Sequence, residues 1–164
     1  MSEESSEEAD GYRFESSVPS NLSESDMLRC VEIVGSGGAV TKENATRGLE
    51  RASALVVVRK GADIIAVGAI KRALPSYIAG VGRKAGHPIA DGAHELGYVS
   101  VDPPHRGQHL SSRIVRTLKE NNNGHLFGRT DDGRMKSVLT NAGFQRKGGE
   151  WKGERGNLSL WVTD

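Results

Sequence analysis

The sequence predicts a single α/β domain of the α+β kind, in which helices flank a mixed central β-sheet. Its 164 residues suffice for one hydrophobic core, and its 36% apolar and 26% charged residues are ordinary for a globular protein. Segments of helical periodicity alternate with β-rich segments along most of the chain, which is typical of a sheet covered by helices.

The first 22 residues are predicted to be a disordered acidic tail. Residues 1–26 carry eight acids and one base, a net charge of −7, whereas residues 27–164 carry a net charge of +8. A Ser/Glu-rich segment of this kind buries too little apolar surface to offset its ordering entropy. We therefore expect the domain to span residues 23–164. The tail either solubilises the protein or folds back onto the basic body, where it would compete with an anionic partner.

Two helices are predicted next. Capping-box spacing and apolar residues at helical intervals predict a helix over Ser23–Val34, which the glycines of residues 35–38 end. Thr41 can cap a second helix that runs through Ala52, because the apolar residues of that segment form one stripe. The apolar runs of the sequence extend only over Ala54–Val58 and Ile64–Ile70, far short of the ~20 residues that a membrane span requires.

A β-hairpin and a long loop follow. Two β-rich runs, Ala54–Arg59 and Asp63–Arg72, are separated by a short segment that contains Gly61, which is a hairpin signal. Residues 73–93 are rich in Gly and Pro and show no clear period, so we expect a loop there. A loop of this length inside a compact domain usually has a functional role.

The rest of the chain is predicted to alternate strands and helices. Apolar runs, helical periodicities and Gly breaks give their approximate bounds. The expected strands are Glu95–Val101, Leu126–Arg129, Gly143–Arg146 and Asn157–Val162, and the expected helices are Leu110–Lys119 and Asp132–Ala142.

The junction between the strand Glu95–Val101 and the following helix is a candidate anion site. A strand that runs directly into a helix directs unpaired backbone N–H groups and the positive end of the helix at one spot. Arg106 adds a fixed positive charge, and Gly107 lets a ligand approach the main chain closely. The junction contains neither a Walker nor a Rossmann glycine motif.

These residues resemble the GNAT superfamily of acyl-CoA-dependent N-acetyltransferases. The resemblance rests on Val101-Asp-Pro-Pro-His-Arg106-Gly107, an apolar helix, and the downstream Asn141-Ala-Gly143-Phe144, with the hairpin upstream. It implies a GNAT-like fold, acetyl-CoA as co-substrate without a metal, and transfer of the acetyl group to a primary amine by direct attack.

The resemblance also implies which residues contact the cofactor. Arg106 and Gly107 match the family motif, whereas His109 and Ser111 stand where the family has small residues. Because His109 lacks the freedom of glycine at positive φ, we expect the loop to adopt a conformation open to ordinary residues. The expected cofactor contacts are Val99, Ser100, Val101, Arg106, Gly107, Gln108, His109, Leu110 and Ser111.

The catalytic groups are less complete than the cofactor motif. Glu95 occupies a position where some family members place a glutamate base, which would take the proton of the attacking amine; a purely structural carboxylate is the alternative. Strand alternation places Tyr98 on the face opposite Glu95. The family's thiolate-protonating tyrosine falls on Leu139. Asp132 falls near the phosphates of CoA, where we expect it to cap the next helix.

The sequence does not identify the acceptor amine. The acceptor is either a small molecule or a protein. We expect it to contact the 73–93 loop and the C-terminal strands, with Tyr77 and His87 as substrate contacts. Because the tyrosine is missing, a weak or inactive CoA-binding module is an alternative function. Because the body is basic, an acetyltransferase that acts on a nucleic acid or its protein partner is another. A homodimer is also left open. The single Cys30 and the absence of a signal sequence favour the cytoplasm.

Overall fold

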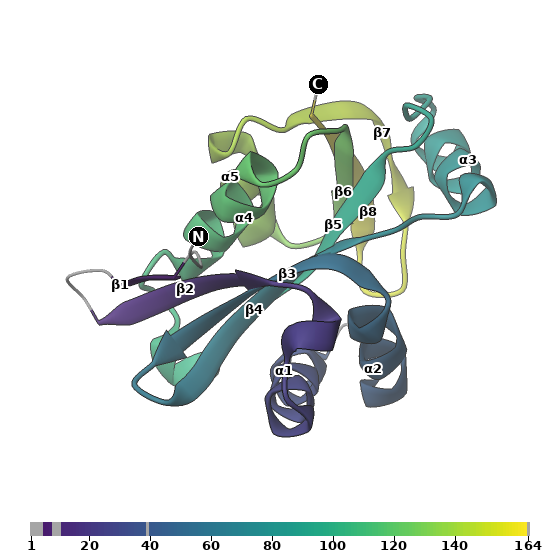
Figure 1. Cartoon of the computed structure of the whole chain (residues 1–164). Coiled ribbons are helices and arrows are strands. Elements are labelled where there is room, and N and C mark those ends of the chain that lie inside the picture. The colour runs from purple at the N-terminus through teal and green to yellow at the C-terminus, as the bar shows by residue number, and fades with distance from the viewer. Residues whose placement is uncertain (1–4, 8–10, 39, 164) are drawn as a thin grey trace.

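The computed structural model describes residues 5–7, 11–38 and 40–163, and in this part of the chain eight strands form one sheet (Figure 1). The strand order is β1-β2-β3-β4-β5-β6-β8-β7, and adjacent strands are antiparallel except for β5 and β6. The strands are β1 (Ser5–Glu7), β2 (Tyr12–Ser17), β3 (Ala52–Lys60), β4 (Asp63–Lys71), β5 (His94–Val101), β6 (Leu126–Thr130), β7 (Gln145–Lys152) and β8 (Asn157–Val162).

Five α-helices and two short 3-10 turns connect these strands. None of the helices in the described ranges is both long and apolar enough to cross a bilayer. The α-helices are α1 (Glu24–Ser36), α2 (Lys42–Glu50), α3 (Pro75–Ala85), α4 (Leu110–Glu120) and α5 (Gly133–Asn141), and the 3-10 turns are η1 (Pro19–Asn21) and η2 (Pro103–His105).

The predicted caps of the first two helices are confirmed. The Ser23 hydroxyl accepts a hydrogen bond from the Asp26 N–H at 3.1 Å, and Thr41 accepts one from the Asn44 N–H at 3.2 Å. Each bond satisfies one N–H group that the helix itself leaves without a partner. The second helix ends earlier than its apolar stripe suggested, because Ala52 is already the first residue of β3.

Helices cover both faces of the sheet, so the central hairpin of β3 and β4 is buried on each side (Figure 1). On one face, α4 and α5 pack over a core that includes Val56, Leu118 and Phe144. On the other face, α1 and α2 cover β3 and β4, and α3 covers a separate cluster on β6 and β8. This mixed sheet flanked by helices is the fold class that the sequence predicted.

The prediction of a disordered tail is wrong for residues 5–7, which form β1, and for residues 11–22. β2 pairs with β3 along its whole length, and Tyr12 and Phe14 on alternate positions are each only 6% exposed. Arg13, between these two aromatics, is paired with Glu15 at 2.9 Å, and Glu15 also lies 2.9 Å from Arg59. Acidic composition therefore concealed a two-residue periodicity, and residues 1–4 and 8–10 of the expected tail lie outside the described residues.

The prediction of a loop over residues 73–93 is also wrong, because about half of this segment is helix α3. Pro75 stands in the first turn, where its missing N–H costs nothing, and Gly86 closes the helix in the left-handed region at φ 74°. Ile78, Val81 and Ala85 form its buried stripe. Because the helix contains glycines, its apolar stripe was not recognised in the sequence.

β5 and β6 separate shortly after they meet. Register pairs join them only at His94 with Leu126 and at Glu95 with Phe127, although β5 continues to Val101. Tyr98 has φ 56°, and the pairing of β5 with β4 shifts register at this point. A bulge of this kind bends its strand, so β5 diverges from β6 and a wedge-shaped gap opens in the sheet.

Candidate functional site

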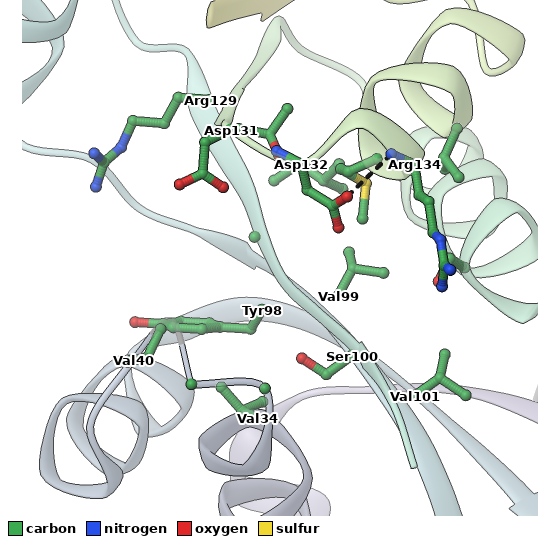
Figure 2. A pocket seen from close by; sticks show the side chains of 18 of the residues that line it. Val34, Val40, Tyr98, Val99, Ser100, Val101, Arg129, Asp131, Asp132 and Arg134 are labelled. Carbon is green, nitrogen blue, oxygen red and sulfur yellow. Dashed lines mark hydrogen bonds between the residues drawn. The ribbon is translucent and has the colours of Figure 1, made fainter. Parts of the chain in front are cut away.

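The gap between β5 and β6 is the mouth of a large cleft with a volume of about 1290 Å³. Its walls come mainly from four regions that are distant in the sequence: the end of α1 with the following loop, β5 with the start of α4, the end of β6 with the start of α5, and the β7–β8 hairpin. Lys71 of β4 and Lys84 of α3 also line it. Figure 2 shows this arrangement, with Val99 on one side of β5 and Tyr98 on the other, beside Val40.

One end of the cleft, which we call the cofactor end, consists of Val99–Val101 and the loop Arg106–Ser111. α4 has no side-chain cap among the described residues, in contrast to α1, α2 and α5. Its first intrahelical bond is donated by Arg113 to the His109 carbonyl. The N–H groups of Leu110, Ser111 and Ser112 therefore point out of the helix end into the cleft, where they can bind an anion.

Two residues of this loop adopt positive φ. Gly107 has φ 86°, and a Cβ built on it would have no atom within 4 Å, so the main chain is open to a ligand. His109 has φ 60° and ψ 25°, in the left-handed region. The expectation that a histidine would enforce an ordinary conformation is therefore wrong, because the strand-to-helix turn imposes the left-handed conformation whatever the side chain.

Arg106 is held at the mouth of the cofactor end. Its Nε donates a hydrogen bond to the Val101 carbonyl at 3.1 Å, and the residue lines the cleft. Most of the residues expected to contact the cofactor line the cleft. The exception is Gln108, which is exposed in the same loop but does not line it.

The opposite end, which we call the acceptor end, is built around Glu95. This carboxylate is 5% exposed and both its oxygens have partners. Oε1 lies 3.3 Å from Lys71 Nζ, while Oε2 lies 3.4 Å from Arg129 Nε and accepts a hydrogen bond from the Tyr77 hydroxyl at 3.1 Å. The cluster thus joins residues from β4, α3, β5 and β6.

Tyr77 lies behind Glu95 and does not line the cleft. Its hydroxyl donates to Glu95 and accepts a 2.7 Å hydrogen bond from Arg129 Nε. Burial and the adjacent Glu95 charge raise the pKa of Tyr77. Burial lowers the pKa of Arg129, but the interactions of Arg129 with Tyr77 and Glu95 outweigh this effect and leave its pKa raised. Tyr77 is therefore a neutral donor that orients the carboxylate. It does not have the position expected for a substrate contact.

His87 is also absent from the cleft walls. It follows α3 and lies against Gly148 of β7, and its buried Nδ1 has no hydrogen-bond partner in the described structure. Of the two tryptophans, Trp151 lines the cleft, whereas Trp161 is 7% exposed in the core under α5.

Tyr98 lies on the same face of β5 as Glu95, contrary to the prediction from strand alternation. Its ring centroid is 4.4 Å from Lys71 Nζ, the same ammonium that pairs with Glu95. The bulge at Tyr98 causes this exception, because an extra residue in a strand reverses the alternation that follows it. The hydroxyl packs against α2 at Gly48, where a Cβ would lie 1.9 Å from the oxygen.

The remaining family positions have structural roles. Asp132 caps α5, as predicted, by accepting the Arg134 N–H at 3.0 Å (Figure 2). Leu139 is 2% exposed in the core and borders a cavity of about 180 Å³ beside β5. Among the described residues, no group of three His, Cys, Asp or Glu side chains could hold a metal ion.

Sequence reasoning missed Lys71 and Arg129, the two cations of the acceptor end. Lys71 is the last residue of β4 and Arg129 lies on the short β6, and each was only one base among many in a basic body. No local motif could have identified them, since only the cross-strand neighbours of Glu95 give them a role.

Comparison with solved structures identifies proteins that share this fold. No family model matches the sequence, and no curated protein sequence matches it either. Escherichia coli ElaA aligns with a TM-score of 0.68 at 10% identity, covering 93% of this chain and 99% of that one. An acyl-CoA N-acyltransferase from Pseudomonas aeruginosa aligns with a TM-score of 0.67 at 10% identity, covering 92% and 98%.

A GNAT-family acetyltransferase from Streptococcus agalactiae gives a TM-score of 0.67 at 12% identity, covering 92% of this chain and 94% of that one. Each alignment therefore spans nearly the whole length of both chains. At these identities the likeness concerns the fold, and it confirms the resemblance to GNAT proteins at that level.

Proposed function

We propose that this chain, which has the fold of the GNAT acetyltransferases, transfers an acetyl group from acetyl-CoA to a primary amine by direct attack. The observation that carries the proposal is the split between β5 and β6, which joins an uncapped helix end on one side to a buried carboxylate on the other within one cleft. The low-identity neighbours of the same fold support acyl transfer as the reaction class.

The residues at the cofactor end suit acetyl-CoA. The N–H groups at the start of α4 and the Arg106 guanidinium offer donors and positive charge to a diphosphate, with Gly107 open beside them. Beyond Glu95, β5 has no register partner in β6, so the backbone of Val99–Val101 has a free edge for an extended pantetheine chain. When bound, acetyl-CoA supplies the activated acyl group.

We assign Glu95 the role of general base at the acceptor end. An amine reaches its carboxylate by displacing Lys71 from Oε1, while Arg129 and Tyr77 continue to hold Oε2. The amine nitrogen forms a bond to the acetyl carbon, its proton passes to Glu95, and the carbon–sulfur bond breaks. The buried position of Glu95 keeps bulk water away from this step.

The leaving thiolate takes its proton from water in this proposal. Leu139 occupies the position of the family's tyrosine and is buried in the core, and the hydroxyl of Tyr98 packs against α2. These two observations also favour a second candidate, a module that binds CoA without efficient turnover. Both candidates require the cofactor end, and only the first requires an active Glu95.

Two measurements test the proposal and separate the candidates. Calorimetry with acetyl-CoA should show saturable binding that Arg106→Gln weakens, with Arg116→Gln on the exposed surface of α4 as the matched control. Release of free CoA thiol should then be followed with a panel of primary amines. Absence of acetyl-CoA binding rejects both candidates, whereas binding without release on the whole panel favours the module.

A further inference from the structure

Lys71 places a primary amine of the protein itself at the acceptor end of the cleft. Its Nζ lies 3.3 Å from Glu95 Oε1 and 4.4 Å from the centroid of the Tyr98 ring. The side chain is 24% exposed and lines the cleft, so it is reachable from the cleft without being a freely solvated surface lysine.

Lys71 also lies against the part of β5 that leads to the free strand edge. A Cβ built on Gly97 would be 2.8 Å from Lys71 Cε and 3.1 Å from Nζ. The ammonium therefore sits over Gly97, two residues before Val99, where the cofactor end begins. The absence of a side chain at position 97 is what lets the lysine cross the strand here.

These contacts give Lys71 the same surroundings that an acceptor amine requires. A carboxylate base at hydrogen-bonding distance removes the proton that blocks attack, and an aromatic face stabilises the cation before it loses that proton. The other cation of the cluster, Arg129, has no such reactivity, because a guanidinium remains protonated.

We propose that Lys71 is a site of self-acetylation, with acetyl-CoA as the acyl donor; this inference rests on the proposed function. The Lys71 ammonium gives one proton to Glu95, its neutral Nζ then forms a bond to the acetyl carbon, and the carbon–sulfur bond breaks to release CoA thiolate. The second nitrogen proton passes through water to that thiolate. The product is a neutral amide, which no longer pairs with Glu95. Acetylation would thus replace the ion pair at Glu95 Oε1 with an amide that occupies the site of the acceptor amine.

The chain offers internal references for the experiment. Lys84 and Lys152 line the same cleft but are exposed, and in the described structure neither ammonium has an ion pair or side-chain hydrogen bond. The protein is incubated with acetyl-CoA, and acetylation at each lysine is followed over time by peptide mass spectrometry. We expect Lys71 to be acetylated at least tenfold faster than either reference.

Variants separate enzymatic acetylation from simple chemical reactivity. Glu95→Gln should slow acetylation of Lys71 by about 10²-fold without changing the rate at Lys84, and Lys71→Arg should abolish the fast phase of CoA release in the absence of added amine. Unfolding the protein in urea should remove the preference for Lys71, since the three lysines then have equivalent surroundings.

Three outcomes are distinguishable. Acetylation concentrated at Lys71 supports the inference. Turnover of free amines with Lys71 unmodified, or modified no faster than Lys84, overturns the inference and leaves the proposed function intact. Bound acetyl-CoA with neither free amines nor Lys71 acetylated overturns both, because the base then acts on no amine.

Discussion

The two ends of the cleft consist of different chemical groups. The cofactor end consists mainly of backbone: an uncapped helix start, a strand edge and two residues at positive φ. The acceptor end consists of side chains, in which Lys71, Tyr77 and Arg129 converge on the buried Glu95. One end therefore depends on chain conformation and the other on the mutual placement of charges.

This difference predicts how each end responds to change. A backbone site tolerates side-chain replacement as long as the local φ and ψ are kept, whereas a buried charge cluster loses function when any partner leaves. Apart from Arg106, whose charge belongs to the cofactor end, substitutions that alter conformation should therefore act on acetyl-CoA affinity, and substitutions that alter charge or packing should act on amine transfer.

The largest effect is expected at Glu95. Glu95→Gln removes the proton acceptor while keeping its shape, so kcat/KM for amine transfer should fall by about 10²-fold. Glu150→Gln, an exposed carboxylate on β7, is the matched control and should leave the rate unchanged. A wild-type rate in Glu95→Gln would remove the base role.

Gly48→Ala tests the packing of the acceptor end. The new Cβ would overlap the Tyr98 hydroxyl and lie 2.6 and 2.8 Å from two ring carbons, so the side chain must shift, at a cost of about 1–3 kcal/mol in unfolding free energy. We expect a higher KM for the amine and an unchanged Kd for acetyl-CoA. Gly80→Ala in α3 is the control, since its Cβ would meet only Arg83 at 3.8 Å.

Gly107→Ala tests the cofactor end. Alanine at positive φ costs about 1–2 kcal/mol, and loop distortion should weaken acetyl-CoA binding about tenfold, as measured by calorimetry. Gly61→Ala, in the β3–β4 hairpin at φ 63° and also without neighbours within 4 Å, should cost similar stability. Equal losses of affinity in the two variants would contradict a specific role for the loop.

Tyr77→Phe should reduce amine transfer several-fold, since it removes the hydrogen bond that orients Glu95. Because burial and the Glu95 charge raise the pKa of Tyr77, the phenol stays neutral across the pH range of an assay, and the variant should keep both limbs of the wild-type pH profile. Tyr12→Phe, which loses a bond to His105 instead, is the control. Loss of a limb in Tyr77→Phe would indicate that the phenol itself titrates.

His109→Gly should have the smallest effect. Glycine removes the steric cost of the left-handed conformation, but it also raises the entropy of the unfolded chain, which offsets part of the gain. We therefore expect the unfolding free energy, measured by urea denaturation, to rise by no more than about 1 kcal/mol. His125→Gly, an exposed histidine without positive φ, should be neutral or destabilising. Destabilisation by His109→Gly would show that the imidazole itself supports the loop.

The cofactor end was predictable from the sequence, because its signal is local. Arg106 and Gly107 follow a strand and precede a helix within a few residues, and the structure places both at the cleft. The acceptor end was predicted only at Glu95. Tyr77 and His87 were expected to contact substrate from a flexible loop, but α3 directs Tyr77 behind Glu95 and leaves His87 outside the cleft.

By itself, the sequence determined the fold class, the caps at Ser23, Thr41 and Asp132, and the helix α4 at whose start we propose an anion site. All of these follow from interactions between residues close together in the chain. Only the tertiary structure decided that Phe14 joins the core, that Tyr98 faces Lys71, and that two cations hold Glu95. These depend on strand register and a bulge, which long-range pairing sets and local patterns do not encode.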